Sequence, residues 1–97
     1  MADSEHAAAA ALKLGETLDI LAVASLKSDL IALRGRDLTI DASDVRRVGG
    51  QCLQVLLSAT ATWAADGHAL TLSSPSSDFV EGVTLLGAPS LGAAPVN

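Results

Sequence analysis

Aromatic and basic residues are scarce in this sequence. Its 97 residues include one tryptophan, Trp63, one phenylalanine, Phe79, and no tyrosine. Proteins that bind nucleic acids or sugars stack bases or rings on aromatic faces, so this scarcity argues against both functions. Six Lys and Arg stand against eleven Asp and Glu, which gives a formal net charge of -5. Such a chain repels nucleic acid and anionic membranes unless its basic residues cluster, and only Arg46 and Arg47 are adjacent.

Cysteine and histidine are too few for most metal or redox chemistry. A single cysteine, Cys52, excludes an internal disulfide and a cysteine-based metal cluster, and it fits a reducing compartment. His6 and His68 have no partners at ligand spacing, so we expect no metal site. We expect a cytoplasmic protein without direct membrane insertion. Asp3 and Glu5 replace the basic residues of a signal peptide, and no apolar run reaches membrane-spanning length.

The apolar content is high and indicates one folded domain. Apolar residues make up 49% of the chain, mostly Leu, Ala and Val, so a packed core is expected and disorder is not. A chain of 97 residues can bury one modest core. We expect a flexible N-terminus over 1–8, a domain over 9–87 and a C-terminal tail over 88–97 that contains prolines and a glycine.

The first third of the chain predicts two strands and a helix. Residues 9–14 alternate toward their end and predict a strand, although their alanines would also suit a helix. Residues 15–17 predict a turn, so that a second strand over 18–20 would form a hairpin with the first. Apolar residues then recur at three- and four-residue spacing over 21–33, which predicts a helix. They are Val23, Leu26, Leu30 and Leu33.

The rest of the chain alternates strands and helices. Short apolar strands are predicted at 38–40 and 69–72, and amphipathic helices at 50–65 and 78–86. Strand–helix–strand units imply right-handed crossovers and parallel pairing. The predicted fold class is therefore α/β, with a mixed sheet of about four strands and three to four helices.

No pattern of residues points to catalysis. Gly49 and Gly50 stand at a helix start, where phosphate can bind, but the Lys-Ser/Thr of a P-loop and the spaced glycines of a dinucleotide fold are missing. Asp41 and Asp44 lie in a loop and are typical of caps or turns. The helix dipole could lower the thiol pKa of Cys52, yet a free cysteine is more commonly a small buried residue. We therefore expect neither an enzyme nor a bound cofactor.

The stretch from Leu38 to Asp66 has a distinctive layout. A short apolar strand ends on Asp41, a loop of the form Asp-Ala-Ser-x-Val-x-x-Val follows, and a helix opens with a glycine pair and a Leu. A strand, a turn and a last helix come after it. This layout resembles a STAS domain, the family of anti-sigma factor antagonists and of the cytoplasmic tails of sulfate transporters. The resemblance covers roughly 9–87 and implies a small STAS-like fold.

The motif that carries the family's switch is altered in this chain. In that family the segment usually reads Asp-Ser-Ser-Gly-Leu or Asp-Thr-x-Gly-Leu, and its first Ser or Thr is phosphorylated by a partner kinase. Leu53 is kept, whereas Gly49 stands at the Asp position, Gly50 at the phosphoacceptor position and Cys52 at the Gly position. Glycine has no hydroxyl, so the resemblance implies a docking loop that lacks its usual covalent switch.

Three interpretations of this departure remain open. The domain docks constitutively, it is switched at another residue, or it is a scaffold in a larger complex. Ser43 is the nearest alternative acceptor, although a serine in a turn more often only shapes the turn. Arg46 and Arg47 are either solvated loop charges or partners for an acidic patch on another protein. The candidate partner-binding residues are Ser43, Arg46, Arg47, Gly49, Gly50 and Gln51.

The resemblance implies a non-enzymatic regulatory module of bacterial signalling, including chemotaxis and two-component systems. Its partner would be an anti-sigma factor or a kinase with a related ATP-binding domain, docked on the loop before the long helix. Free-standing STAS domains also resemble the small cytoplasmic subunit of lipid-transporting ABC complexes, which binds the ATPase. That accessory role is the alternative function.

Overall fold

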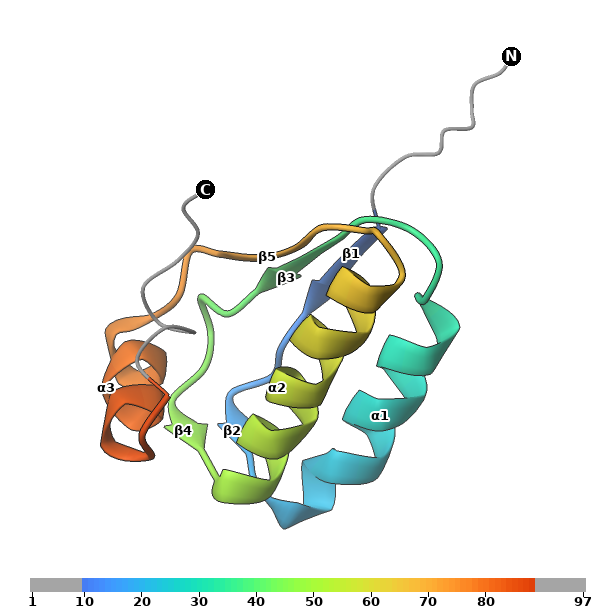
Figure 1. The fold of residues 1–97 in the computed structure, drawn as a ribbon. Coiled ribbons are helices and arrows are strands. Elements are labelled where there is room, and N and C mark those ends of the chain that lie inside the picture. Colours follow the sequence, from blue (N-terminus) through green and yellow to red (C-terminus); the bar gives the residue numbers. More distant parts are fainter. Residues whose placement is uncertain (1–9, 89–97) are drawn as a thin grey trace.

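The structure, a computed structural model, describes residues 10–88. Two helices, α1 and α2, lie side by side over one face of a three-stranded sheet, and a third helix, α3, lies at one side next to a second, two-stranded sheet (Figure 1). The elements in chain order are β1 (Ala10–Lys13), β2 (Thr17–Leu18), the short 3₁₀ helix η1 (Ile20–Ala22), α1 (Val23–Ala32), β3 (Leu38–Asp41), β4 (Arg47–Val48), α2 (Gly50–Ala65), β5 (Leu70–Ser73) and α3 (Ser77–Leu85).

The strand pairings among residues 10–88 are all parallel. The larger sheet has the order β1-β3-β5, with Leu38 of β3 aligned between Ala10 and Leu70, and the smaller sheet pairs β2 with β4. The sequence predicted one mixed sheet of about four strands, whereas five strands form in two sheets. The α/β class and the alternation of strands and helices from β3 onward are confirmed.

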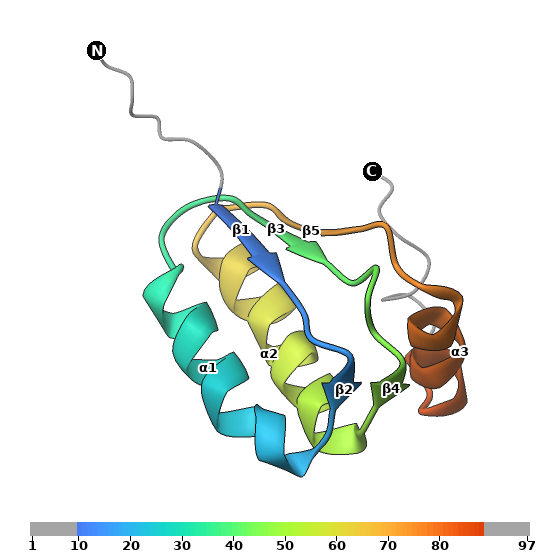
Figure 2. The same ribbon diagram turned by 180° about the vertical axis from the view of Figure 1, so that it is seen from behind.

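The predicted hairpin between the first two strands is wrong. β1 runs on into β2 without reversing (Figure 2), and each of the two strands pairs with a strand from the next unit of the chain. The N–H of Leu14, just after β1, donates to the carbonyl of Asp41 at 2.9 Å. Ile20, predicted as strand, begins η1, which Asp19 caps by accepting from the N–H of Leu21 at 3.0 Å. Residues 15–17 include turn-forming residues, but the pairing of β1 with β3 and of β2 with β4 determines the direction in which the chain continues.

The two covering helices match their patterns closely. α1 buries Leu26 and Leu30 against the sheet, as the spacing predicted. α2 has the predicted bounds, and it buries Trp63, whose indole Nε1–H donates to the carbonyl of Arg36 at 2.7 Å. The largest fully buried side chains of the core are Phe79, Leu38, Ile40, Leu56, Val45, Val83 and Cys52.

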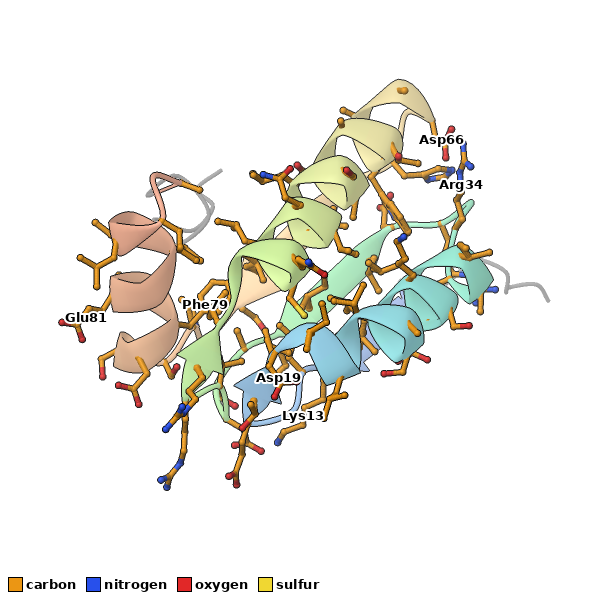
Figure 3. The ribbon with its side chains drawn as sticks, turned by 90° about the horizontal axis from the view of Figure 1, so that it is seen from below. Lys13, Asp19, Arg34, Asp66, Phe79 and Glu81 are labelled. Carbon is orange, nitrogen blue, oxygen red and sulfur yellow. The ribbon has the colours of Figure 1, made fainter. Side chains whose placement is uncertain are left out.

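Helix α3 packs against β4 rather than over the larger sheet. Its cap, Ser76, accepts from the N–H of Phe79 at 3.0 Å, and Phe79 points from α3 into the interior (Figure 3). A Cβ built on Gly82 would lie 3.4 Å from Cβ of Val48, so the helix backbone approaches the strand closely. Ala88 is also buried, and the rest of the predicted tail, like the predicted N-terminus over 1–8, lies outside the described residues.

An exposed ion pair joins the C-terminal ends of α1 and α2. Arg34 Nε lies 2.8 Å from Asp66 Oδ2, and the two side chains point toward one another (Figure 3). The hydrogen bond from Arg34, supported by its positive charge, lowers the pKa of the Asp66 carboxyl, and the pKa of Arg34 is raised in return. A carboxyl with a lowered folded pKa stabilises the fold above its unfolded pKa and loses that contribution as the pH falls.

The Asp66→Asn variant is expected to unfold more easily than the wild type at neutral pH, and the difference should shrink from about pH 4 downward. Urea denaturation followed by circular dichroism from pH 7 to pH 3 measures this convergence. Asp29→Asn is the matched control, because Asp29 has no ion-pair partner among residues 10–88. A difference for Asp66→Asn that stays constant over the range would contradict the assigned role.

Gly82 offers a test of the close packing between α3 and β4. Gly82→Ala places a methyl group at ordinary contact distance from Val48 and removes a helix-interior glycine, so we expect the free energy of unfolding to rise by about 0.5–1 kcal/mol. Gly82→Leu should lower it by about 1–3 kcal/mol, because the longer side chain overpacks the contact. Thermal and urea denaturation distinguish the two, and equal stabilities would show that α3 is not held at this distance.

Candidate functional site: the loop between β3 and α2

Two buried side chains, Ala42 and Val45, anchor the loop between β3 and α2, residues 42–49, to the core. Ala42 is 0% and Val45 is 1% exposed. The hydroxyl of Ser76 donates to the carbonyl of Val45 at 2.6 Å, and the N–H of Ser76 donates to the carbonyl of Ala42 at 3.1 Å. The start of α3 is thereby tied to the underside of the loop, and the loop has little freedom to move as a unit.

Backbone hydrogen bonds to β2 and to Glu16, the residue before it, also hold the loop in place. The N–H groups of Arg46 and Arg47 both donate to the carbonyl of Glu16, at 2.7 and 3.1 Å, and the N–H of Gly49 donates to the carbonyl of Leu18 at 2.7 Å. These bonds form the short strand β4, whereas the sequence predicts a loop at these residues. A strand of only two residues, Arg47 and Val48, leaves no periodicity to detect.

Ser43 shapes the beginning of the loop. Its N–H donates to Asp41 Oδ1 at 2.9 Å, which is a side-chain turn of the kind that Asp commonly forms. Hydrogen bonds from the Ser43 side chain and N–H lower the pKa of the Asp41 carboxyl. Ser43 is nevertheless exposed, and the neighbouring Asp44 is paired with Lys13 Nζ at 3.3 Å. The turn-forming role expected for this serine is therefore present in the structure.

Both loop arginines are exposed, but they do not stand in a purely basic patch. Arg46 Nε lies 4.0 Å from Glu16 Oε1, with both side chains largely in solvent. Such an exposed pair contributes little to stability. A hollow of about 480 Å³ between β4 and α3 is lined by the two arginines and also by Asp78 and Glu81 of α3. The acidic residues of α3 are members of this surface that sequence reasoning missed, because only the tertiary packing of α3 brings them there.

Gly49 and Gly50 differ sharply in the space around them. A Cβ on Gly49 would lie 3.2 Å from the carbonyl oxygen of Leu18, which is tighter than an ordinary contact. A Cβ on Gly50 would meet nothing within 4 Å, and Gly50 is exposed at the first position of α2. Gly50, which the resemblance to STAS domains aligns with a phosphoacceptor, is therefore exposed to solvent, and a side chain there would be accommodated.

Cys52 is a buried packing residue. It is 0% exposed, and its Sγ–H donates to the carbonyl of Asp19 at 3.3 Å. Burial, together with the negative charge of Asp19, raises the pKa of the Cys52 thiol. This direction is opposite to the one that the helix dipole would give, and the burial of Cys52 confirms the alternative of a small buried residue.

The six predicted site residues fall on neighbouring hollows rather than in one pocket. Arg46, Arg47 and Gly49 line the hollow beside α3, and Ser43 and Arg46 line a second one of about 470 Å³. Gln51 faces a third hollow, between α1 and α2. Gly50 lies between them at the start of α2. The predicted surface therefore surrounds the loop and borders these hollows, and we call it the loop ridge.

The histidine that the structure describes, His68, lies away from this loop. His68 Nδ1 lies 3.3 Å from Asp37 Oδ1 at the other end of the sheet, and His6 is outside the described residues. Within residues 10–88, no group of three or more His, Cys, Asp or Glu side chains is placed to hold a metal ion. In the same part of the chain, no helix combines the length and the apolar character needed to cross a membrane.

Comparison with known proteins identifies the family. A family model described as "Mlab, STAS domain" matches residues 1–91, and the chain belongs to the STAS domain family. No curated protein and no solved structure matches the chain. STAS domains are generally non-catalytic binding modules and commonly interact with proteins. The β3–α2 loop holds four of the six predicted partner-binding residues and remains the candidate site of this chain.

The glycine pair gives a matched test of the loop geometry. Gly49→Ala should lower the free energy of unfolding by about 1 kcal/mol, because Ala is a poor N-cap residue and its methyl group would crowd the Leu18 carbonyl. Gly50→Ala should leave it unchanged or raise it by up to about 1 kcal/mol, because the site is open and helical. Urea denaturation should therefore show a loss of stability for Gly49→Ala and none for Gly50→Ala. A stable Gly49→Ala protein would contradict the close approach of β2.

Proposed function

We propose that this chain is a protein-binding regulatory module of the cytoplasm that docks its partner through the ridge around the β3–α2 loop. The observation that carries the proposal is the combination of a fixed backbone with outward-facing side chains. Backbone bonds from Arg46, Arg47 and Gly49 hold the loop in place, while Ser43, Arg46, Arg47, Gly50 and Gln51 remain exposed. A surface that is ordered before binding loses less conformational entropy when a partner docks.

Docking on this ridge is constitutive in our proposal. Gly50 cannot accept a phosphate, although its position is as open as a phosphoacceptor needs to be. Ser43 is exposed, but it holds the turn with Asp41, so that a phosphate on it would add charge beside a carboxylate. Both features favour a permanent contact over a phosphorylation-dependent one.

The first candidate partner is an anti-sigma factor or a kinase with a related ATP-binding domain, within bacterial signalling that includes chemotaxis and two-component systems. The second candidate is the ATPase of a lipid-transporting ABC complex. The proposed constitutive docking suits a permanent subunit and so favours the second candidate. The description of the matched family names Mlab. In either complex, Arg47 would meet an acidic group of the partner, because it has no ion-pair partner among residues 10–88.

The test is affinity capture of the tagged chain from the bacterium that produces it, with quantitative mass spectrometry. A specific partner should be retained by the wild type and lost at least tenfold with Arg47→Glu and with Gly50→Asp, which corresponds to about 1.4 kcal/mol of binding free energy. Arg36→Glu is the matched control, because it makes the same charge change at another exposed arginine. The identity of the partner separates the signalling candidate from the transport candidate.

Two results would contradict the proposal. If every captured protein is retained equally by Arg47→Glu, Gly50→Asp and Arg36→Glu, the ridge is not the docking surface. The second result applies if the captured partner is a kinase. The chain is then incubated with that kinase and ATP, and the position of any phosphate is mapped. A phosphate on Ser43 that releases the partner would show that docking is switched and not constitutive.

A further inference from the structure

A groove runs between α1 and α2 on the side of the helices that faces away from the sheet. We call it the helix groove. It has a volume of about 610 Å³ and lies beside the loop ridge, which it meets at Gln51. Its lining residues share a position on the facing edges of the two helices. They are Val23, Lys27, Leu30, Ile31, Arg34, Gln51, Gln54, Val55, Ser58, Ala59, Thr62 and Trp63.

The charge of the helix groove is opposite to that of the chain. Its lining contains Lys27 and Arg34 and no acidic residue, although the chain has eleven acidic and six basic residues. The two hollows beside the loop both include carboxylates. Arg34 is already paired with Asp66, whereas Lys27 has no ion-pair partner within residues 10–88. The lining therefore favours an occupant with negative charge.

The helix groove also has exposed apolar surface. Ile31 is 74% exposed on α1, and half-buried Val23 and Val55 flank the space next to it. The uncharged polar residues of the lining, such as Gln54 and Ser58, come from α2. An occupant that suits this surface is apolar on one side and carries acidic or hydrogen-bonding groups along its edges.

The shape of the helix groove fits a helix. From Val23 to Arg34 and from Gln51 to Thr62 the lining residues recur every three or four positions, so each wall extends over about three helical turns, or roughly 16 Å. The backbone groups of both walls are already bonded within their helices. An extended segment would find no strand edge here to satisfy its own N–H and C=O groups, whereas a helix satisfies them internally.

We propose that the helix groove binds an acidic amphipathic helix of a partner protein. The apolar side of that helix covers Ile31, Val23 and Val55, and its carboxylates meet Lys27 and the amide and hydroxyl groups of α2. This binding site is separate from the loop ridge, and it extends the protein-binding role to a second surface. The proposal does not depend on the docking of the first partner.

The chain supplies its own reporter for the test. Trp63 is the only tryptophan and lines the helix groove. The probe is a synthetic 18-residue amphipathic helix with leucines on one face, glutamates along both edges and no aromatic residue. Titration into the full chain should change the Trp63 emission in a saturable way and weaken as salt is added. A second peptide with lysines in place of the glutamates should bind at least tenfold more weakly.

Matched variants assign the binding to the helix groove. Lys27→Glu should weaken binding of the acidic peptide at least tenfold, while Arg36→Glu, with the same change of charge outside the groove, should leave it within twofold. Ile31→Ser should weaken it at least fivefold, while Leu85→Ser, at an 80% exposed leucine of α3, should not. These side chains are largely exposed, and circular dichroism would verify that each variant is folded.

Three outcomes would overturn the proposal. The first is the absence of saturable peptide binding up to millimolar peptide, by Trp63 emission and by calorimetry alike. The second is equal weakening by Lys27→Glu and Arg36→Glu, which would reduce the effect to net charge. The third is a concentration-dependent dimer in sedimentation that Ile31→Ser abolishes, which would make a second copy of the chain the occupant. None of these results bears on the loop ridge, which Arg47→Glu and Gly50→Asp test separately.

Discussion

Backbone hydrogen bonds between β2 and β4 hold the loop ridge in position. The carbonyls of Glu16 and Leu18 accept from the N–H groups of Arg46, Arg47 and Gly49. Because side chains take no part in these bonds, substitutions at 46 and 47 leave the backbone in place. The ridge can therefore vary its chemistry without losing its shape. Position 49 is the exception, because its contact with the Leu18 carbonyl leaves almost no room for a side chain.

Helix α3 adds a second level of organisation to the same ridge. The hydroxyl of Ser76 caps α3 and at the same time bonds the carbonyl of Val45, so that the helix start and the loop form one unit. This arrangement brings Asp78 and Glu81 to the hollow that the two arginines line. Alternating charge on a docking surface contributes orientation and selectivity more than affinity, because each wrong placement of a partner brings like charges together.

The parts of the fold that depend on local periodicity could be predicted from the sequence. The bounds of α2 and the buried face of α1 follow from apolar spacing and from stop signals. The hairpin prediction was wrong because residues 15–17 permit a turn without requiring one, and the pairing of β1 depends on β3. In the candidate site, the exposure of the loop was predictable. The division of its residues among three hollows was not, since it depends on where α3 and α1 pack.

The parallel pairing of all five strands within residues 10–88 affects how the protein reaches its folded state. Each strand pairs with a partner about thirty residues away, so no local segment can form a stable sheet by itself. Folding that relies on such distant contacts is slower than folding through hairpins, because loop closure precedes any gain from pairing. Glu16 and Arg47 meet only when both halves of the domain are in place. The loop ridge therefore exists only in the complete fold, so that the docking proposed for it would select for intact domains.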